Sequence, residues 1–325
     1  MQYRNMGRWG VKVSAVGLGS YLTIGFKISD DVSRATVVKA YEGGVNFFDT
    51  ADAYHGGEAE RVLGEILSEF PRHTLFLLTK CWAPITEDIN DRGLSAKHIF
   101  EACHKSLKRL RTDYLDCYMC HRPDPDTPLE ETIRALEDLA RQGKILYWGV
   151  SEWPAYLITR ANRVAREIGA RPVTVNEPRY NLLFRYPERN LFPATEAEGV
   201  GNVIFSPLAH GMLTGKYKPG EGAPAGTRAS DEETNSIIMK LYWTEENKLK
   251  GLELAKLAAD MGVTAAQLAI AWCLRNPAVT SVITGATKVS QVEENIRAAD
   301  MVIPDDVAAK IEELYPPVER VDVEK

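Results

Sequence analysis

The sequence predicts an α/β fold, a closed (β/α)8 barrel of the TIM type, and three observations support this prediction. Short apolar runs alternate with longer amphipathic stretches along the 325 residues. The ends of most apolar runs lie about 30 residues apart, which is the length of one βαβ unit. Eight such runs occur, and eight βα units favour a closed barrel over an open sheet. We therefore expect a single domain over residues 1–325.

The eight apolar runs are candidates for buried parallel strands. Residues 45–48, 75–78 and 114–119 are examples rich in aromatic or β-branched side chains, as expected for strands covered on both faces. Ahead of them, the segment that leads through Arg8 and Gly10 to Val16 predicts a short N-terminal hairpin. The expected strand ends are Gly19, Asp49, Lys80, His121, Val150, Asn176, Phe205 and Ile283.

Amphipathic helices are expected between these strands. Ser29 and Ser95 stand before two of them, and serine caps a helix because its hydroxyl accepts a free backbone N–H. A segment rich in Gly, Pro, Ser and charge, 215–242, predicts a long loop over one mouth of the barrel. Two helices before the eighth strand and extra C-terminal helices complete the fold. The expected ranges are 32–41, 59–70, 96–110, 129–142, 156–168, 187–198, 246–261 and 265–276.

Composition excludes several functional classes. The chain has 39 Lys and Arg against 45 Asp and Glu, so it lacks the basic surface that nucleic acid or an anionic membrane requires. No run approaches the roughly 18 apolar residues of a membrane span, and no secretory signal is visible. Five cysteines without framework spacing are typical of reduced thiols. We expect a cytoplasmic protein with a small-molecule partner, and homo-oligomerisation stays open.

Four polar residues are candidates for an active site. Asp49, Lys80 and His121 end three consecutive strands, and Tyr54 lies in the loop after Asp49. Barrel active sites lie at the C-terminal ends of the strands, so these side chains are expected to converge. Each alone is typical of a cap or a surface residue. Four chemically complementary residues at successive strand ends favour catalysis.

Their chemistry is mutually consistent. The ordinary pKa of tyrosine, about 10, is too high for efficient proton donation near neutral pH. A nearby Lys80 ammonium is expected to lower the pKa of Tyr54, because positive charge favours the phenolate. Asp49 is expected to keep the ammonium charged. His121 is then available to donate a hydrogen bond to a carbonyl oxygen as negative charge develops there.

Motifs after the strand ends carry a family resemblance. They are residues 48–54, 57–60 and 63–64, 79–80, 122–124, 149–151, 206–209, Gly211, 215–217, and the stretch from Gly285 to Asn295. In this order they resemble the aldo-keto reductases over nearly the whole chain. Through residues 122–125, 147–149 and 269–276, the chain most resembles the branch that contains bacterial reductases and the β subunits of voltage-gated potassium channels.

The resemblance implies hydride transfer from NADPH, with NADH less favoured, to an aldehyde or ketone. Tyr54 would then donate the proton, assisted by Lys80 and Asp49, while His121 orients the carbonyl. The channel subunits typically carry Asn at the position of His121. Because this chain has all four candidate catalytic residues, the resemblance favours an enzyme over a nucleotide-sensing accessory protein with little turnover. A lyase or isomerase acting through a Lys80 Schiff base is a further alternative.

The resemblance also implies which residues hold the cofactor without a Rossmann unit. Ser151 would contact the carboxamide, Tyr180 would stack on the nicotinamide, and Arg228 would supply a cation to the pyrophosphate. Lys288 at a helix start suits a 2′-phosphate, although it is equally typical of a solvated lysine. The expected set is Ser20, Tyr21, Asp49, Ser151, Glu152, Glu177, Tyr180, Phe205, Ser206, Pro207, Leu208, Ala209, Lys216, Arg228, Gly285, Thr287, Lys288, Gln291, Glu294 and Asn295.

Two expected cofactor residues depart from the family pattern. Glu177 stands where the family usually has Gln, and Glu152 where it has Asn or Arg. An anionic Glu177 beside the ring would favour NADP⁺ over NADPH, unless it is protonated or paired with Arg179. Comparing both affinities in the wild type and Glu177→Gln tests this hypothesis.

The substrate pocket is expected to have aromatic walls. Tyr21, Phe26, Trp82 and Trp153 follow strand ends, although each is equally consistent with packing. The run Cys117–His121 matches a haem-attachment pattern, but its two cysteines point to opposite faces of a strand. The six histidines show no metal-ligand spacing. We therefore expect neither haem nor metal.

Overall fold

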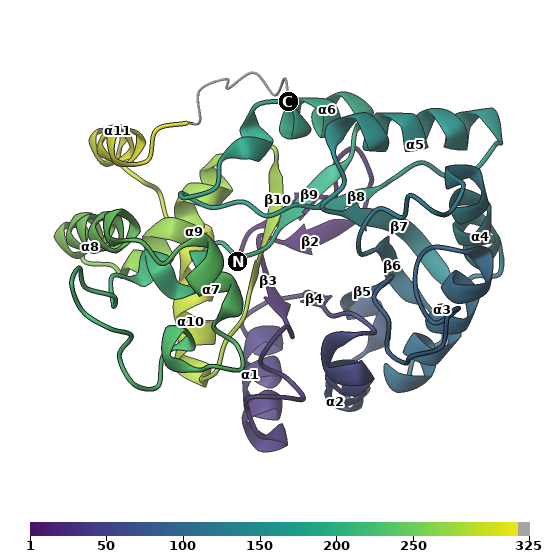
Figure 1. Cartoon of the computed structure of the whole chain (residues 1–325), viewed down its shortest axis with the longest axis horizontal. Helices are drawn as coiled ribbons and strands as arrows, with labels where there is room; N and C mark the ends of the chain where they lie inside the picture. Colours follow the sequence, from purple (N-terminus) through teal and green to yellow (C-terminus); the bar gives the residue numbers. More distant parts are fainter. Residues whose placement is uncertain (318–325) are drawn as a thin grey trace.

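The computed structural model describes residues 1–317 and contains the predicted barrel. Its strands pair in parallel in chain order, and the last strand pairs with the first (Figure 1). Every predicted strand end lies within one residue of the observed end. The strands are β3 (Val16–Gly19), β4 (Phe47–Asp49), β5 (Phe76–Cys81), β6 (Leu115–Cys120), β7 (Ile145–Ser151), β8 (Val175–Glu177), β9 (Gly201–Ile204) and β10 (Val279–Thr284).

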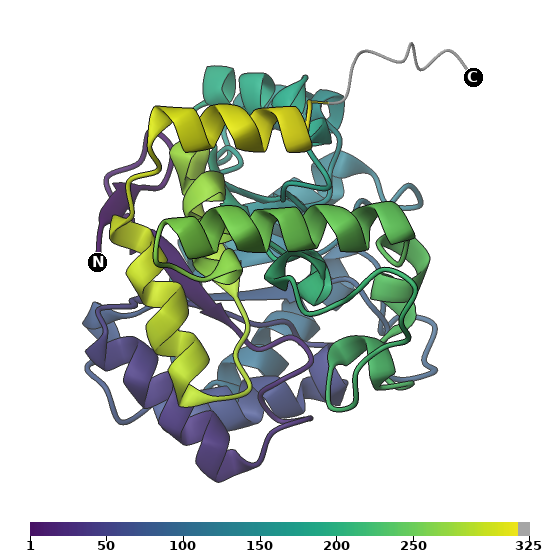
Figure 2. The ribbon, with the colours of Figure 1, turned by 90° about the vertical axis from the view of Figure 1, so that its left-hand side faces the viewer.

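Helices form the outer layer of the barrel. α10 lies beside α1, just as β10 lies beside β3, and α8 contacts α11 (Figure 2). Ser29 and Ser95 cap α1 and α3 as predicted. The helices are α1 (Asp30–Glu42), α2 (Glu58–Leu67), α3 (Ala96–Arg109), α4 (Leu129–Arg141), α5 (Ala155–Glu167), α6 (Leu191–Glu198), α7 (Ser236–Leu241), α8 (Glu245–Asp260), α9 (Ala265–Arg275), α10 (Val289–Arg297) and α11 (Asp305–Leu314).

Two helix predictions were wrong in detail. The helix expected from residue 187 begins at Leu191, because Tyr186–Glu188 form a separate 3₁₀ turn and Asn190 adopts a non-helical backbone. The segment 215–242 also contains α7, which buries Ile238. A six-residue helix is too short to show a clear period in a sequence.

The barrel interior is apolar and is closed at its N-terminal end by the predicted hairpin. β1 (Tyr3–Asn5) pairs antiparallel with β2 (Lys12–Ser14). Met6 and Val13 from this hairpin pack with Phe47, Phe76 and other inward-facing strand residues. The hairpin thus fills the N-terminal end of the barrel, whereas a cavity opens at its C-terminal mouth.

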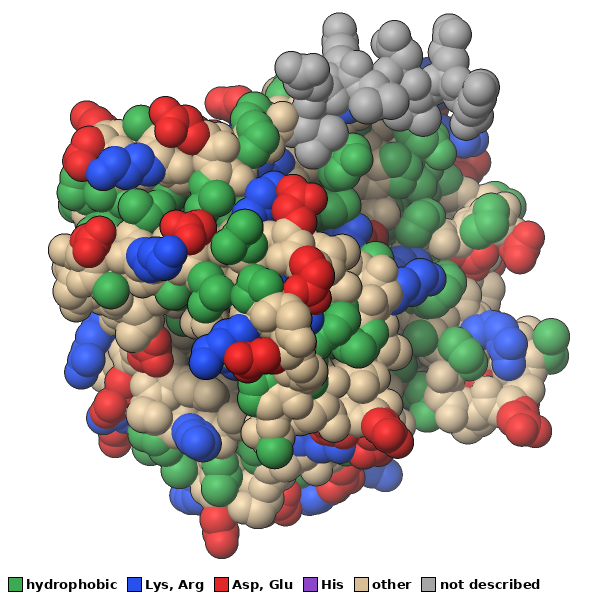
Figure 3. Space-filling model, turned by 60° about the vertical axis from the view of Figure 1, so that its left-hand side comes forward, with side chains coloured by type: hydrophobic (Ala, Val, Ile, Leu, Met, Phe, Trp, Pro, Cys, Tyr) green, Lys and Arg blue, Asp and Glu red, His purple; other side chains and the backbone are tan. Residues whose placement is uncertain are grey.

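Helix length and surface charge are two further features of the fold. Within residues 1–317 no single helix is both long and apolar enough to cross a bilayer; α8 and α9 meet the length and composition only as a pair bent by 91°. Acidic and basic side chains are intermixed over the face shown in Figure 3. This face therefore carries no extended patch of one charge.

Packing of α2 against the end of α3 gives a first prediction. A Cβ on Gly64 would lie 2.6 Å from the carbonyl oxygen of Arg109 and closer still to Leu110 Cα. Intrinsic helix propensity alone would make Gly64→Ala stabilising. We instead expect destabilisation by about 1–3 kcal/mol, because backbone must move. Thermal denaturation should show a Tm lower by several degrees.

Gly10→Ala is the matched control, since no atom lies within 4 Å of its added Cβ. Its Tm should equal that of the wild type. A Gly64→Ala protein as stable as Gly10→Ala would contradict the packing of α2 on α3.

Candidate active site

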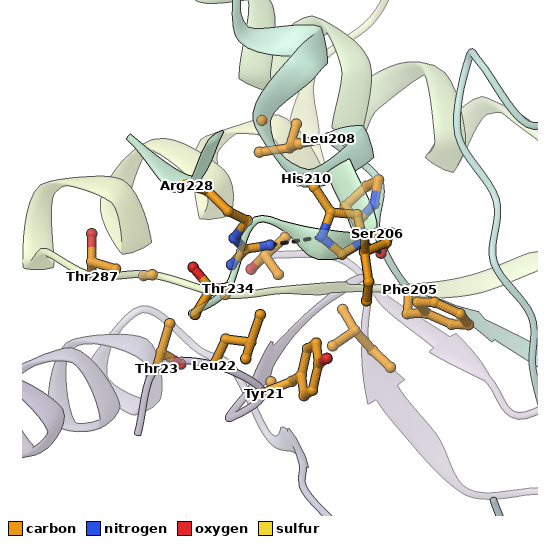
Figure 4. Close-up of a pocket in the computed structure, with 18 of the residues that line it drawn as sticks. Tyr21, Leu22, Thr23, Phe205, Ser206, Leu208, His210, Arg228, Thr234 and Thr287 are labelled. Carbon is orange, nitrogen blue, oxygen red and sulfur yellow. Dashed lines mark hydrogen bonds between the residues drawn. The ribbon is translucent and has the colours of Figure 1, made fainter. Parts of the chain in front are cut away.

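A cavity of about 1640 Å³ opens at the C-terminal mouth of the barrel. Tyr21, Leu22 and Thr23 line one side of it, and Phe205 and Ser206 line the other (Figure 4). These residues follow β3 and β9, which are separated in the barrel only by β10. The cavity therefore lies where a barrel fold places its functional groups.

Lys80 is the centre of the polar cluster at the inner end of this cavity. Its side chain is fully buried, and its ammonium forms an ion pair with Asp49 Oδ1. It donates to the carbonyl oxygen of Thr50 at 3.0 Å and to Tyr54 Oη at 3.5 Å. Glu177 Oε2 lies 3.3 Å from the same nitrogen. The strand ends of β4, β5 and β8 thus meet at one ammonium.

Negative charge beside this buried ammonium keeps it protonated. Burial alone would lower the pKa of Lys80, but the charge on the neighbouring carboxyl groups, that of Asp49 first, raises it above its ordinary value. Burial raises the pKa of Asp49, and Lys80 opposes this shift. The predicted role of Asp49, pairing with the ammonium, therefore agrees with the geometry.

Tyr54 and His121 complete the predicted group of four. Their ring centroids lie 5.7 Å apart, and both side chains line the cavity. Burial raises the pKa of Tyr54; Lys80 lowers it, but Asp49 and Glu177 raise it further. This corrects the expectation of an acidified phenol: Lys80 acts in the expected direction, but burial outweighs it.

The imidazole of His121 is neutral at pH 7. Burial, and then the charges of Lys80 and Arg122, lower the pKa of His121 well below its ordinary value.

Strained backbone is concentrated at the cavity wall. Leu22, Glu152, Ser206 and His210 all adopt a φ between 56° and 60°, which L-residues rarely adopt. All four line the cavity. Ser206 is held by a hydrogen bond from Asn181 Nδ2 to its carbonyl oxygen at 2.9 Å. Such strain persists only where surrounding contacts fix it, and it is typical of binding sites.

A second part of the cavity carries positive charge. Arg228 donates to His210 Nδ1 at 3.1 Å (Figure 4). Burial lowers the pKa of Arg228, and burial followed by Arg228 lowers the pKa of Lys216. A Cβ on Gly211 would lie 3.0 Å from Lys216 Nζ, so the missing side chain leaves room beside this cation. Two cations that line such a space fit an anionic group, such as a pyrophosphate.

The cavity continues to a polar end between α9 and α10. Gly285, Gln291 and Asn295 line this end, and Gln291 Oε1 accepts the backbone N–H of Thr287 at 2.8 Å. Glu294 accepts the Thr264 hydroxyl, which ties α10 to the start of α9. The residues present therefore fit an extended dinucleotide that runs from the Lys80 cluster past the cations to this end.

An ion pair joins the long loop to the opposite wall. Lys27, in the loop after β3, lies 2.9 Å from Asp231 and 2.5 Å from Glu233. Lys27 and Asp231 both line the cavity. The long loop predicted at residues 215–242 is thus held across the cavity mouth.

Most predicted site residues line the cavity, but several do not. Tyr180 is the clearest correction: only 1% of it is exposed, and its ring stacks on Trp272 at 5.2 Å. Phe205 is the aromatic residue that lines the cavity on this side. The predicted residues outside the lining, besides the buried Lys80, are Tyr180, Ser20, Ala209, Lys288, Phe26 and Trp153.

The remaining expected residues, including Tyr21, Ser151, Pro207, Leu208 and Trp82, are part of the cavity lining.

Sequence analysis did not assign several polar lining residues to the site, among them Arg122, Arg179 and His210. Arg122 donates to Ser151 Oγ at 3.3 Å, and Arg179 lies with its guanidinium 3.7 Å from the Phe184 ring centroid. His210 contacts Ser206 and Arg228. Arg122 directly follows His121 and belongs to the motif 122–124, so the sequence could have indicated that it is a site residue. His210 lies between the motif 206–209 and Gly211, and nothing in the sequence itself indicated a role for it.

Comparison with known proteins agrees with this geometry. The model of the aldo/keto reductase family matches residues 15–316. A rice protein (Oryza sativa subsp. japonica) named "Probable voltage-gated potassium channel subunit beta" is 41% identical over 96% of this chain and 96% of its own. A protein of the same name from Arabidopsis thaliana is 40% identical over 93% and 92%, respectively. The chain therefore belongs to the aldo-keto reductase family.

Proposed function

We propose that this protein reduces aldehydes or ketones to alcohols with NADPH, and that Tyr54 donates the proton. The family consists of oxidoreductases that generally use NAD(P)H and act on small carbonyl substrates. The observation that carries the proposal is the contact of Tyr54 Oη with the Lys80 ammonium at 3.5 Å, with His121 beside Tyr54 in one cavity.

Tyr54 and Lys80 act as a unit in this proposal. When bound, the reduced nicotinamide would supply a hydride to the carbonyl carbon. Tyr54 would transfer its phenolic proton to the carbonyl oxygen, which becomes a strong base as the hydride arrives and can therefore take a proton even from a phenol with a raised pKa. The Lys80 ammonium then stabilises the phenolate that remains, because opposite charges attract strongly in a buried site.

Neutral His121 has a different task. An uncharged imidazole donates one ring N–H and accepts at the other nitrogen. Its N–H would hold the carbonyl oxygen near Tyr54 as negative charge develops there. Lys216 and Arg228 would bind the pyrophosphate, and the polar end near Gln291 would hold the adenosine.

Similarity to the potassium channel relatives supports a second candidate function. In this alternative the protein is an accessory subunit that binds the nucleotide and turns over little. His121 favours the enzyme, because the resemblance gives the channel branch Asn at that position. A Lys80 Schiff base is disfavoured: the ammonium is fully buried and held by Asp49, and a charged nitrogen cannot attack a carbonyl.

Replacing the proposed proton donor tests the enzyme directly. With NADPH and a panel of aldehydes, the wild type should oxidise NADPH rapidly. We expect Tyr54→Phe to lower kcat by about 10²–10⁴-fold, because it removes the acid, while the Kd for NADPH changes little. Loss of NADPH absorbance and fluorescence titration give the two quantities.

Tyr114→Phe is the matched control for loss of a phenol. Tyr114 lies just before β6 at the opposite end of the barrel, where its ring packs on Arg72. It should keep wild-type kcat. Full activity in Tyr54→Phe would refute the assignment of the proton donor, and tight NADPH binding without turnover in the wild type would favour the accessory subunit.

The preference for NADPH over NADH is tested at Lys288. This lysine is exposed at the N-cap of α10, close in sequence to the lining residues Thr287 and Gln291. If it pairs with the 2′-phosphate, Lys288→Ala should weaken NADPH binding about twofold to fivefold, as expected for an exposed ion pair, and leave NADH binding unchanged. Equal effects on the two Kd values would refute this role.

A further inference from the structure

Glu177 is a second carboxyl group at Lys80, and the ammonium has no hydrogen atom left for it. An ammonium has three N–H donors. Those of Lys80 are directed at Asp49 Oδ1, the Thr50 carbonyl oxygen and Tyr54 Oη. Glu177 Oε2 lies 3.3 Å from Lys80 Nζ, yet it has no hydrogen-bond partner within residues 1–317. The contact is therefore electrostatic only.

The charge balance of the cluster favours a neutral Glu177. Lys80 is fully buried, and Asp49 and Glu177 are each only 3% exposed. Two ionised carboxylates around one ammonium would leave a net negative charge away from water, which is strongly unfavourable. Carboxyl groups that share such a site hold one proton between them.

The contacts indicate which carboxyl group holds the proton. Asp49 has the ion pair with Lys80, so its ionised form is the better stabilised. Glu177 Oε2, by contrast, has only the 3.3 Å contact with the same ammonium and no hydrogen-bond partner within residues 1–317, so the proton is held by Glu177.

We propose that Glu177 is a carboxylic acid at neutral pH and supplies the proton that restores Tyr54 after each turnover. This inference rests on the proposed reduction. Once Tyr54 has given its proton to the substrate oxygen, Lys80 passes one of its protons to the phenolate oxygen. The Glu177 carboxyl group then protonates Lys80 and becomes a carboxylate. Solvent returns one proton to Glu177, so the site ends as it began.

The groups around Glu177 support its neutral form. Asp49, Lys80, Tyr54, Arg122 and Cys117 face it from β4, β5, β6 and the loops that follow β4 and β6. Burial and then Asp49 raise the pKa of Glu177 well above its ordinary value, and Lys80 and Arg122 oppose them. The acid form is therefore present at low pH, persists beyond the ordinary titration range of a glutamic acid, and is lost as the pH rises through the raised pKa.

A neutral Glu177 also bears on the hypothesis that an anionic Glu177 would favour NADP⁺ over NADPH. Glu177 contacts Lys80, whereas the Arg179 guanidinium lies over the Phe184 ring. A carboxylic acid adds no charge beside the ring. We therefore expect the ratio of the NADP⁺ and NADPH affinities at pH 7 to be the same in wild type and Glu177→Gln.

Infrared spectroscopy of the protein without nucleotide tests the protonation. The difference spectrum between wild type and Glu177→Gln at pH 7 should contain one C=O stretching band of a protonated carboxylic acid. This band should disappear from the wild type as the pH is raised. Its absence at pH 7 would overturn the proposal.

Asp52→Asn is the matched control. Asp52 is also buried, and burial raises its pKa well above the ordinary value, so it should give a carboxylic acid band of its own. Asp52→Asn should lose that band and keep the band of Glu177. If it instead removes the band assigned to Glu177, that assignment is wrong and the proposal is overturned.

A single turnover tests the proton supply. After wild-type enzyme is mixed with NADPH and an aldehyde, the Glu177 band should fall as the alcohol forms and then recover. A band that persists while the alcohol forms would overturn the supply role. A protonated Glu177 in a protein that reduces no carbonyl would instead refute the proposed function and leave the protonation established.

Discussion

A fully buried ammonium organises the mouth of this barrel. Lys80 ends its strand inside the protein, so its charge must be balanced by groups that the fold brings to it. Asp49 comes from β4, Tyr54 from the loop after it, and Glu177 from β8, three strands away from β5 around the barrel. Removing a partner of a buried charge typically destabilises a protein by about 3–5 kcal/mol. The same interaction therefore stabilises the barrel mouth and assembles the candidate catalytic groups.

The cavity has two electrostatic regions that suit different parts of one ligand. Around Lys80 the charges of the ammonium and of Asp49 nearly cancel when Glu177 is protonated. A nearly neutral site suits a reduction in which Tyr54 gives a proton to the substrate. Around Lys216 and Arg228 positive charge predominates, which suits phosphate groups. The ion pairs of Lys27 with Asp231 and Glu233 hold the long loop across the mouth. The fold thus places the cations that would bind the phosphate groups and the residues that would transfer the proton in separate parts of one cavity.

The architecture was predictable because it depends on periodicity and strand length, which are local properties of a sequence. Asp49, Lys80 and His121 could be placed together since barrel strands present their C-terminal ends at one mouth. Side-chain direction was less predictable: Tyr180 turns away from the cavity and stacks on Trp272, a contact between residues 92 positions apart. The pKa of Tyr54 was also misjudged, because burial depends on the packing of several loops. The contact of Glu177 with Lys80 depends on distances across the barrel that spacing along the chain does not specify.

The central claim is that Lys80 is a charged ammonium held by buried carboxyl groups. Nitrogen NMR of lysine-labelled protein tests it most directly, with the Lys80 signal assigned by its loss in Lys80→Arg. The ionised Asp49 raises the pKa of Lys80 against the effect of burial, so its Nζ should remain protonated at neutral pH and titrate above the ordinary lysine value of about 10.4. A neutral amine at pH 7 would contradict the account, because such a group could neither stabilise a Tyr54 phenolate nor restore its proton.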